Sequence, residues 1–237
     1  MYPLTPVVRD PFGVTEVLRS TYPDGLLQMA EWLNALGGFP LVLVLPLVFY
    51  LYFDQRRQMA LVLAYLLASQ SIVFVLKSFF GLPQSPEIYH VIDIIPEGDT
   101  NGFPSRAAAA ATAVYIGTVY EVDTDKKRLW GAFAGFLILA ISISRVVLGY
   151  HYVGDMIAGG VLGMLTVVVI SHVSDGNPVY GFALALPFTV LAVPVSGNTQ
   201  AIMAMGGALG GVMASLWVRN SDSDILKKIA QVAIGLL

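Results

Sequence analysis

Long apolar stretches separated by short polar segments dominate this chain. A helix that spans a membrane needs about 20 mainly apolar residues, with about 17 tolerated. None of the stretches alternates between apolar and polar residues as barrel strands do, and backbone groups in hydrocarbon must pair within their own segment, so helices are expected. The pattern therefore predicts an all-α fold, a polytopic transmembrane helical bundle of about six or seven spans. Seven stretches qualify or nearly qualify as spans: residues 38–53, 58–80, 104–121, 128–148, 152–172, 179–196 and 200–218.

The first 36 residues differ from this pattern. Segment 14–36 mixes Leu, Met and Trp with charged residues, which is typical of an amphipathic helix that lies in the membrane interface. A short eighth span is the alternative. We therefore divide the chain into an N-terminal interfacial segment at 1–36, a transmembrane domain at 37–218 and a cytoplasmic C-terminal tail at 219–237.

Composition supports a membrane environment and excludes several classes of site. The chain of 237 residues is 56% hydrophobic and 12% charged, with a mean hydropathy of +0.72, which a soluble domain would not show. It contains no cysteine, so disulfides, thiolate nucleophiles and thiolate metal ligands are excluded. The formal net charge of −3 is no indication of a nucleic-acid partner.

The short loops differ in their content of Lys and Arg, which predicts the orientation of the bundle. Basic residues gather in segments 54–58, 126–128 and 219–228, which lie on one side if seven spans alternate. Cytoplasmic loops carry the excess of Lys and Arg. We therefore expect an integral protein of the cell membrane whose other face, formed by 81–103, 144–155 and 196–200, is non-cytoplasmic.

Polar side chains with chemical potential lie at helix ends on that non-cytoplasmic face. Charges at membrane depth are costly, so each is a candidate for function. His151 and Asp155 are four residues apart, a helical spacing at which the carboxylate can accept the imidazole N–H. Ser105 precedes a run of alanines, which predicts a capped helix N-terminus that attracts anions. Together these side chains indicate a phosphate site: Lys77, Ser105, Arg106, Arg145, His151 and Asp155.

The spacing of these residues resembles a known family. Segment 144–155, Ser-Arg, five residues, His, three residues, Asp, is similar to the third motif of the type 2 phosphatidic acid phosphatases. Segment 102–107, Gly-Phe-Pro-Ser-Arg-Ala, resembles the second motif, Pro-Ser-x-His. Lys77 followed by 81–86 resembles the first motif, Lys, six residues, Arg-Pro. The resemblance covers about residues 77–172.

This resemblance implies roles for the individual residues. His151 would attack phosphorus to form a phosphohistidine, and Asp155 would fix its tautomer and stabilise the charged ring. The phosphate oxygens would be bound by cationic and polar groups. The family uses no metal or other cofactor, and the substrate would be a membrane lipid phosphate or an isoprenoid phosphate. The residues expected to bind phosphate are Lys77, Gln84, Ser105, Arg106 and Arg145.

Two positions depart from the family motifs. Ala107 stands where the family has the histidine that protonates the leaving group, and Gln84-Ser85 stands in place of Arg-Pro. A positioned general acid is typically worth about 10²–10⁴ in rate, so an ordinary phosphomonoesterase activity is in question. Ala107 is either a natural divergence or an inactivating substitution.

Two routes would preserve activity without that histidine, and a non-enzymatic function is the alternative. An acid from the 89–99 loop, namely His90, Glu97 or Asp99, could replace it, or the substrate could be a diphosphate whose leaving group needs less protonation. The leading hypothesis is a phosphatase or phosphotransferase. The alternative is a catalytically inactive homologue that binds a phosphorylated lipid. A transporter would be expected to show paired repeats with broken helices, and the sequence offers no convincing pair.

Overall fold

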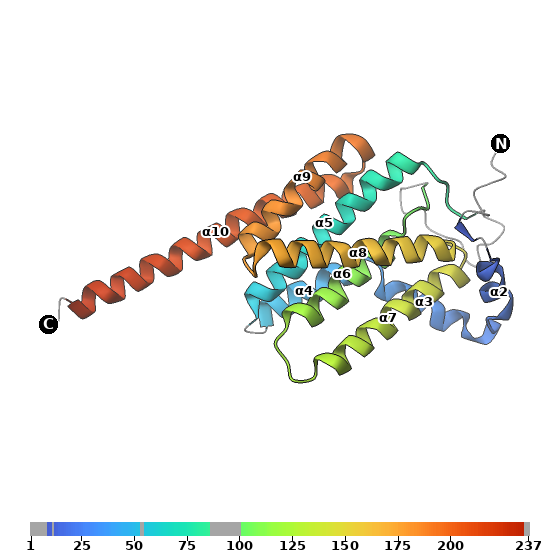
Figure 1. The fold of residues 1–237 in the computed structure, drawn as a ribbon, viewed down its shortest axis with the longest axis horizontal. Coiled ribbons are helices and arrows are strands. Elements are labelled where there is room, and N and C mark those ends of the chain that lie inside the picture. Colours follow the sequence, from blue (N-terminus) through green and yellow to red (C-terminus); the bar gives the residue numbers. More distant parts are fainter. Residues whose placement is uncertain (1–8, 11, 53–54, 86–100, 235–237) are drawn as a thin grey trace.

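The computed structural model describes residues 9–10, 12–52, 55–85 and 101–234, and Figure 1 shows a bundle of helices. The described part contains no strand, only an isolated antiparallel bridge between Pro83 and Asn101. The predicted all-α membrane bundle is thereby confirmed. The elements are α2 (Val14–Thr21), the short helix η1 (Asp24–Leu26), α3 (Leu27–Leu36), α4 (Phe39–Tyr52), α5 (Arg56–Phe80), α6 (Arg106–Glu121), α7 (Lys127–Val147), α8 (Val153–Ser174), α9 (Pro178–Ser196) and α10 (Thr199–Ile234).

Five of these helices are long and apolar enough to cross a membrane: α5, α7, α8, α9 and the Thr199–Arg219 part of α10. A sixth span results if the bent pair Asp24–Leu36 and Pro40–Leu51, which meet at 54°, counts as one. The remaining helix of the bundle, α6, has 16 residues. The outer faces of α7 to α10 carry large exposed apolar side chains, as expected of surfaces in contact with lipid. The protein is therefore an integral membrane protein.

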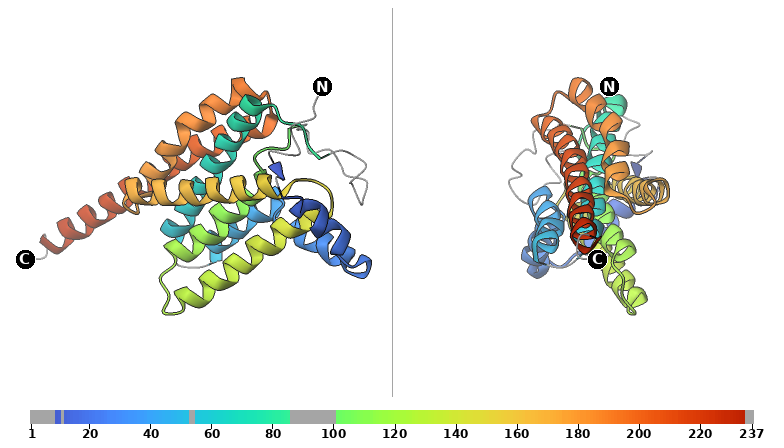
Figure 2. Two further views of the ribbon diagram at one scale, coloured as in Figure 1. Left: turned by 45° about the vertical axis from the view of Figure 1, so that its right-hand side comes forward. Right: turned by 90° about the vertical axis from the view of Figure 1, so that its left-hand side faces the viewer.

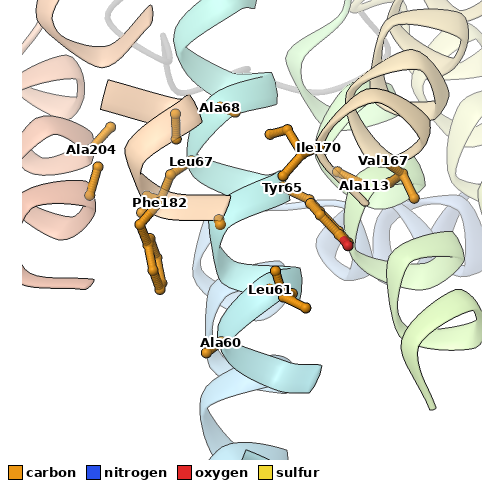
Figure 3. Packing of buried hydrophobic residues seen from close by; sticks show 13 residues of the cluster. Ala60, Leu61, Tyr65, Leu67, Ala68, Ala113, Val167, Ile170, Phe182 and Ala204 are labelled. Carbon is orange, nitrogen blue, oxygen red and sulfur yellow. The ribbon is translucent and has the colours of Figure 1, made fainter. Parts of the chain in front are cut away.

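Helix α5 is the central element of the bundle. It packs against α4, α6, α8, α9 and α10, and Tyr65 near its middle is fully buried. Figure 3 shows Tyr65 pointing toward Ala113 of α6 and Val167 of α8. On the other side of α5, its own residue Leu67 lies near Phe182 of α9. Because α5 is held from several sides, its C-terminal end is a fixed platform for side chains placed there.

Helices α6 and α8 pack through small residues. A Cβ added to Gly159 would lie 2.3 Å from the carbonyl oxygen of Ser105, and one added to Gly163 would lie 2.5 Å from that of Ala109. Only glycine permits such a close approach of two helix backbones. The contact aligns the two N-terminal ends, and the Ser105 N–H donates to the backbone oxygen of Asp155 at 3.0 Å.

The N-terminal segment and the C-terminal helix lie toward opposite ends of the molecule. The segment expected to form one interfacial helix at 14–36 is divided into α2, η1 and α3, and both α2 and α3 pack on α7. Figure 2 shows α2 beside the start of α8, where the Val153 N–H donates to Oγ1 of Thr15 at 3.2 Å. At the other end α10 projects beyond the bundle (Figure 1). It continues as helix through most of the expected tail at 219–237 and ends at Ile234.

Candidate active site

The candidate residues lie at matching ends of their helices, on the side of the bundle where Figure 1 shows α2. Lys77 is in the last turn of α5, and Ser105 is the N-cap of α6. Arg145 is in the last turn of α7, His151 lies in the connection to α8, and Asp155 is in the first turn of α8. All five are buried, with at most 3% of their surface exposed. Burial of charged groups requires compensating partners.

His151 and Asp155 form a hydrogen-bonded pair. The Nδ1 of His151 lies 3.3 Å from Oδ2 of Asp155. The same carboxylate oxygen accepts from the backbone N–H of Tyr152 at 3.0 Å, so the first turn of α8 holds the carboxylate in place. With Nδ1 turned to the carboxylate, Nε2 is the ring nitrogen left for chemistry.

The surroundings of His151 favour its neutral form. Burial lowers the pKa of His151 below its ordinary value of 6.5; the hydrogen bond and charge of Asp155 oppose this, and the positive charges of Arg145 and Lys77 lower the pKa further. A neutral imidazole at neutral pH is the form that can act as a nucleophile.

The start of α6 is built as the sequence predicted. Ser105 is confirmed as the N-cap, since its Oγ accepts from the N–H of Ala108 at 3.4 Å. The side chain of Arg106 makes different contacts from that of Ser105. Its Nη1 donates to Oε1 of Gln200 on α10, and its guanidinium lies 5.3 Å from the centre of the Phe74 ring. The side chain of Arg106 therefore makes contacts on α5 and α10.

The remaining predicted positions have defined surroundings. Lys77 donates from Nζ to the backbone oxygen of Asn101 at 2.5 Å, and the Arg145 guanidinium lies 5.2 Å from the centre of the Tyr150 ring. Gln84 is half-buried. Ala107 is 5% exposed and lies beside Gly37 at the end of α3. The three proposed substitute acids in the 89–99 loop, His90, Glu97 and Asp99, fall outside the described residues.

Arg9 is a site residue that the sequence interpretation missed. Its Nε donates to Oδ1 of Asp155 at 2.6 Å and its Nη2 to Oδ2 at 2.5 Å, while Nη1 donates to the backbone oxygen of Pro83 at 2.6 Å. A planar guanidinium bound to both oxygens of a carboxylate is among the strongest ion-pair geometries. Since 146 residues separate the two partners, no local spacing in the sequence could have indicated this pair.

Arg19 of α2 is a second missed residue. Its Nε donates to the backbone oxygen of Val146 at 2.9 Å, and its Nη2 donates to Oγ of Ser85 at 3.1 Å and to the backbone oxygen of His151 at 3.3 Å. Two arginines of the N-terminal segment thus contact the two segments of chain that resemble the first and third motifs.

The described part of the chain contains no group of three or more His, Asp or Glu side chains placed as metal ligands would be. The charges that act on His151 include those of Arg145 and Lys77, and a cluster of this kind can bind a phosphate through fixed cations and N–H groups.

The chain resembles known proteins in its sequence and in its fold. The family model described as PAP2 superfamily matches residues 44–178. Among solved structures, the chain is similar to a transmembrane PAP2-type phosphatidylglycerolphosphate phosphatase from Bacillus subtilis, at 20% identity and a TM-score of 0.62, covering 69% of this chain and 83% of the other. It is also similar to Aquifex aeolicus LpxE, at 17% identity and a TM-score of 0.53, covering 66% of this chain and 91% of the other. No curated protein matches the chain.

Proposed function

Because the chain belongs to the PAP2 superfamily, we propose that it is a membrane phosphatase or phosphotransferase that acts on a lipid phosphate or a polyprenyl diphosphate. The observation that carries the proposal is the buried His151–Asp155 pair, with Lys77 and Arg145 acting on the same imidazole. Such a cluster presents a neutral nucleophile among positive charges, which is the arrangement that phosphoryl transfer requires.

In the first step, Nε2 of His151 attacks phosphorus while the bond from phosphorus to the leaving oxygen breaks. The imidazole becomes positively charged as it takes up the phosphoryl group, and Asp155 accepts the Nδ1–H and stabilises that charge. Lys77, Arg145 and the N–H groups at the start of α6 neutralise the charge that spreads over the phosphoryl oxygens. In the second step water attacks phosphorus, the bond to Nε2 breaks and inorganic phosphate leaves. A phosphotransferase would use an acceptor hydroxyl in place of water.

The choice of substrate depends on the leaving group. An alkoxide leaving a lipid monophosphate needs a proton, and Ala107 cannot supply one. A phosphate leaving a diphosphate is a much weaker base and departs with less help. We therefore rank an isoprenoid or lipid diphosphate above a monophosphate as the preferred substrate class.

The proposed site faces the non-cytoplasmic side of the cell membrane. This orientation is supported by the position of the basic segments at the opposite helix ends, including Arg57 at the start of α5 and Lys127 at the start of α7. The substrate would accordingly be drawn from the outer leaflet.

Phosphate release from the purified chain in detergent tests the proposal. The substrates are phosphatidic acid, phosphatidylglycerol phosphate and farnesyl diphosphate. We expect release from the diphosphate to exceed release from either monophosphate, and His151→Asn to abolish it. His172→Asn is the matched control, because His172 is exposed in the last turn of α8. Absence of release from every substrate would refute the enzyme hypothesis.

The alternative is an inactive homologue that binds phosphorylated lipid, and the alanine at position 107 favours it. Restoring the missing acid distinguishes this alternative from an enzyme. Ala107→His is expected to raise monophosphate hydrolysis by about 10²–10⁴, and diphosphate hydrolysis much less. Recovery only when Gln84→Arg is added would assign part of the defect to phosphate binding. If the double variant stays inactive and His151→Ala leaves lipid binding unchanged, the chain binds phosphorylated lipid without turning it over.

A further inference from the structure

The N-terminal segment reaches into the candidate site through one buried side chain. Arg9 is 3% exposed and binds both carboxylate oxygens of Asp155 as well as the backbone oxygen of Pro83. Its guanidinium also lies 4.6 Å from the centre of the Tyr152 ring. A buried guanidinium with this many partners is held in a single geometry.

Two of the motif-like segments leave room for Arg9. A Cβ added to Gly102 would lie 2.6 Å from its Nη2 and 2.8 Å from the oxygen of Pro83. A Cβ added to Gly154 would meet three atoms of Arg9 first, with the backbone oxygen nearest at 2.5 Å. Two glycines that are distant in sequence thus open space for the same residue, which indicates a built contact between the N-terminal segment and the site.

We propose that Arg9 is a positioning residue that holds the Asp155 carboxylate against Nδ1 of His151 and keeps that imidazole oriented and neutral. The inference rests on the proposed function for its catalytic meaning, since Arg9 acts on the nucleophile only through Asp155. Without Arg9, a buried carboxylate would be left with the imidazole as its main side-chain partner. The full negative charge would then draw a proton onto the ring, and a protonated His151 cannot attack phosphorus.

The other charged groups around His151 come from every side. Lys77 on α5 and Arg145 on α7 act on it electrostatically, and Arg19 of α2 donates to its backbone oxygen. Arg106 at the start of α6 is engaged with Gln200. Among the described residues, Arg9 is distinguished from these cations by its two-point contact with the carboxylate that pairs with the ring.

The test measures the ionisation of His151 directly, so that it does not depend on turnover. The full chain is labelled with isotopic histidine and its NMR signals are followed against pH in detergent. The chain has three histidines, at 90, 151 and 172, and His151→Asn identifies the relevant signal. We expect Arg9→Gln to raise the titration midpoint of His151 by roughly one pH unit, since a positive charge is removed from a buried cluster. Arg128→Gln is the matched control, because Arg128 is exposed at the start of α7, and it should leave the midpoint unchanged.

A second route displaces Arg9 without altering any charge. Gly154→Ala introduces the methyl group that meets the Arg9 backbone, so it should raise the midpoint as Arg9→Gln does. The two changes combined should shift it no further than one alone, because both remove the same contact. Arg9→Lys keeps the charge without the two-point geometry and should shift the midpoint less. If Arg9→Gln does not fold, as judged by its thermal unfolding, Gly154→Ala and Arg9→Lys still provide the test.

Two results would overturn the proposal: a midpoint in Arg9→Gln equal to that in Arg128→Gln, or shifts from Arg9→Gln and Gly154→Ala that add. Phosphate release separates this proposal from the proposed function. In an active chain, Arg9→Gln should lower kcat with little change in KM, since the residue does not contact substrate. A chain without turnover whose His151 midpoint still depends on Arg9 would refute the phosphatase hypothesis and leave the assigned contact standing.

Discussion

Close packing of α6 against α8 predicts that the site is sensitive to a single methyl group. Gly159→Ala would put a Cβ 2.3 Å from the backbone oxygen of Ser105, whereas Gly160→Ala, one residue along the same helix, would put its Cβ 3.7 Å from Oγ1 of Thr112. The first distance is a severe overlap and the second is ordinary contact. The two variants share chemistry and helix, so they form a matched pair.

The size of the effect follows from the displacement that relieves the overlap. Restoring ordinary contact requires the two backbones to separate by roughly 1 Å. The Cβ position is fixed by the backbone of α8 and the oxygen belongs to the backbone of Ser105, so neither atom can rotate away. Overpacking of this kind costs about 1–3 kcal/mol in stability. The Ser105 N–H to Asp155 hydrogen bond, at 3.0 Å, would lengthen with it. Misplacement of catalytic groups by about 1 Å can lower a rate by about 10².

The assay is phosphate release from farnesyl diphosphate together with thermal unfolding, measured for both variants. We expect Gly159→Ala to lose about 10² in kcat and to unfold at a lower temperature, and Gly160→Ala to match the parent chain or to be slightly more stable, since alanine favours helix over glycine. Equal rates for the two variants would show that the distance between the two helix ends does not control the reaction.

Three further predictions concern protonation, binding and topology. Because burial lowers the pKa of His151 below 6.5, the unfolded chain takes up that proton more readily; the corresponding stability should be complete above about pH 6.5 and decline below it, and His151→Asn should flatten this part of the unfolding profile. Lys77→Met should weaken inhibition by vanadate, a phosphate analogue, by roughly 10- to 100-fold, as expected for a lost charge-assisted hydrogen bond, while Lys126→Met should not. In intact cells an impermeant thiol reagent should label Thr100→Cys and spare Lys126→Cys; the opposite pattern would invert the proposed orientation.

Much of the fold could be predicted because lipid imposes strict lengths on helices. Each apolar stretch forms one helix, and the capping Ser105 begins α6 as expected. The division of the N-terminal segment also has a local cause, since Pro23 and Gly25 follow the end of α2. The length of α10 has a local cause of the opposite kind. Residues 212–234 contain neither glycine nor proline, so no breaker ends the helix where its apolar part stops.

The site was predictable only where its residues share an element or a motif. His151 and Asp155 are four residues apart, and this spacing predicted their pairing. In the structure His151 lies in the connection before α8 and only Asp155 is helical, so the pair forms at the N-terminal end of the helix. Arg9 and Arg19 reach the site by the packing of a segment that the pattern assigned to the membrane interface, and nothing in their neighbourhood distinguishes them from solvated arginines. Only the tertiary structure brings them to the motif-like segments.

The ion pair between Arg9 and Asp155 joins two residues that are synthesised at different times. Ribosomes add roughly 5–20 residues per second, and 146 residues separate the two partners, so the arginine emerges seconds to tens of seconds before its carboxylate. In the folded protein the N-terminal segment lies on the side where α8 begins. A fusion that held this segment on the other side would leave Asp155 without its guanidinium even if every span inserted correctly.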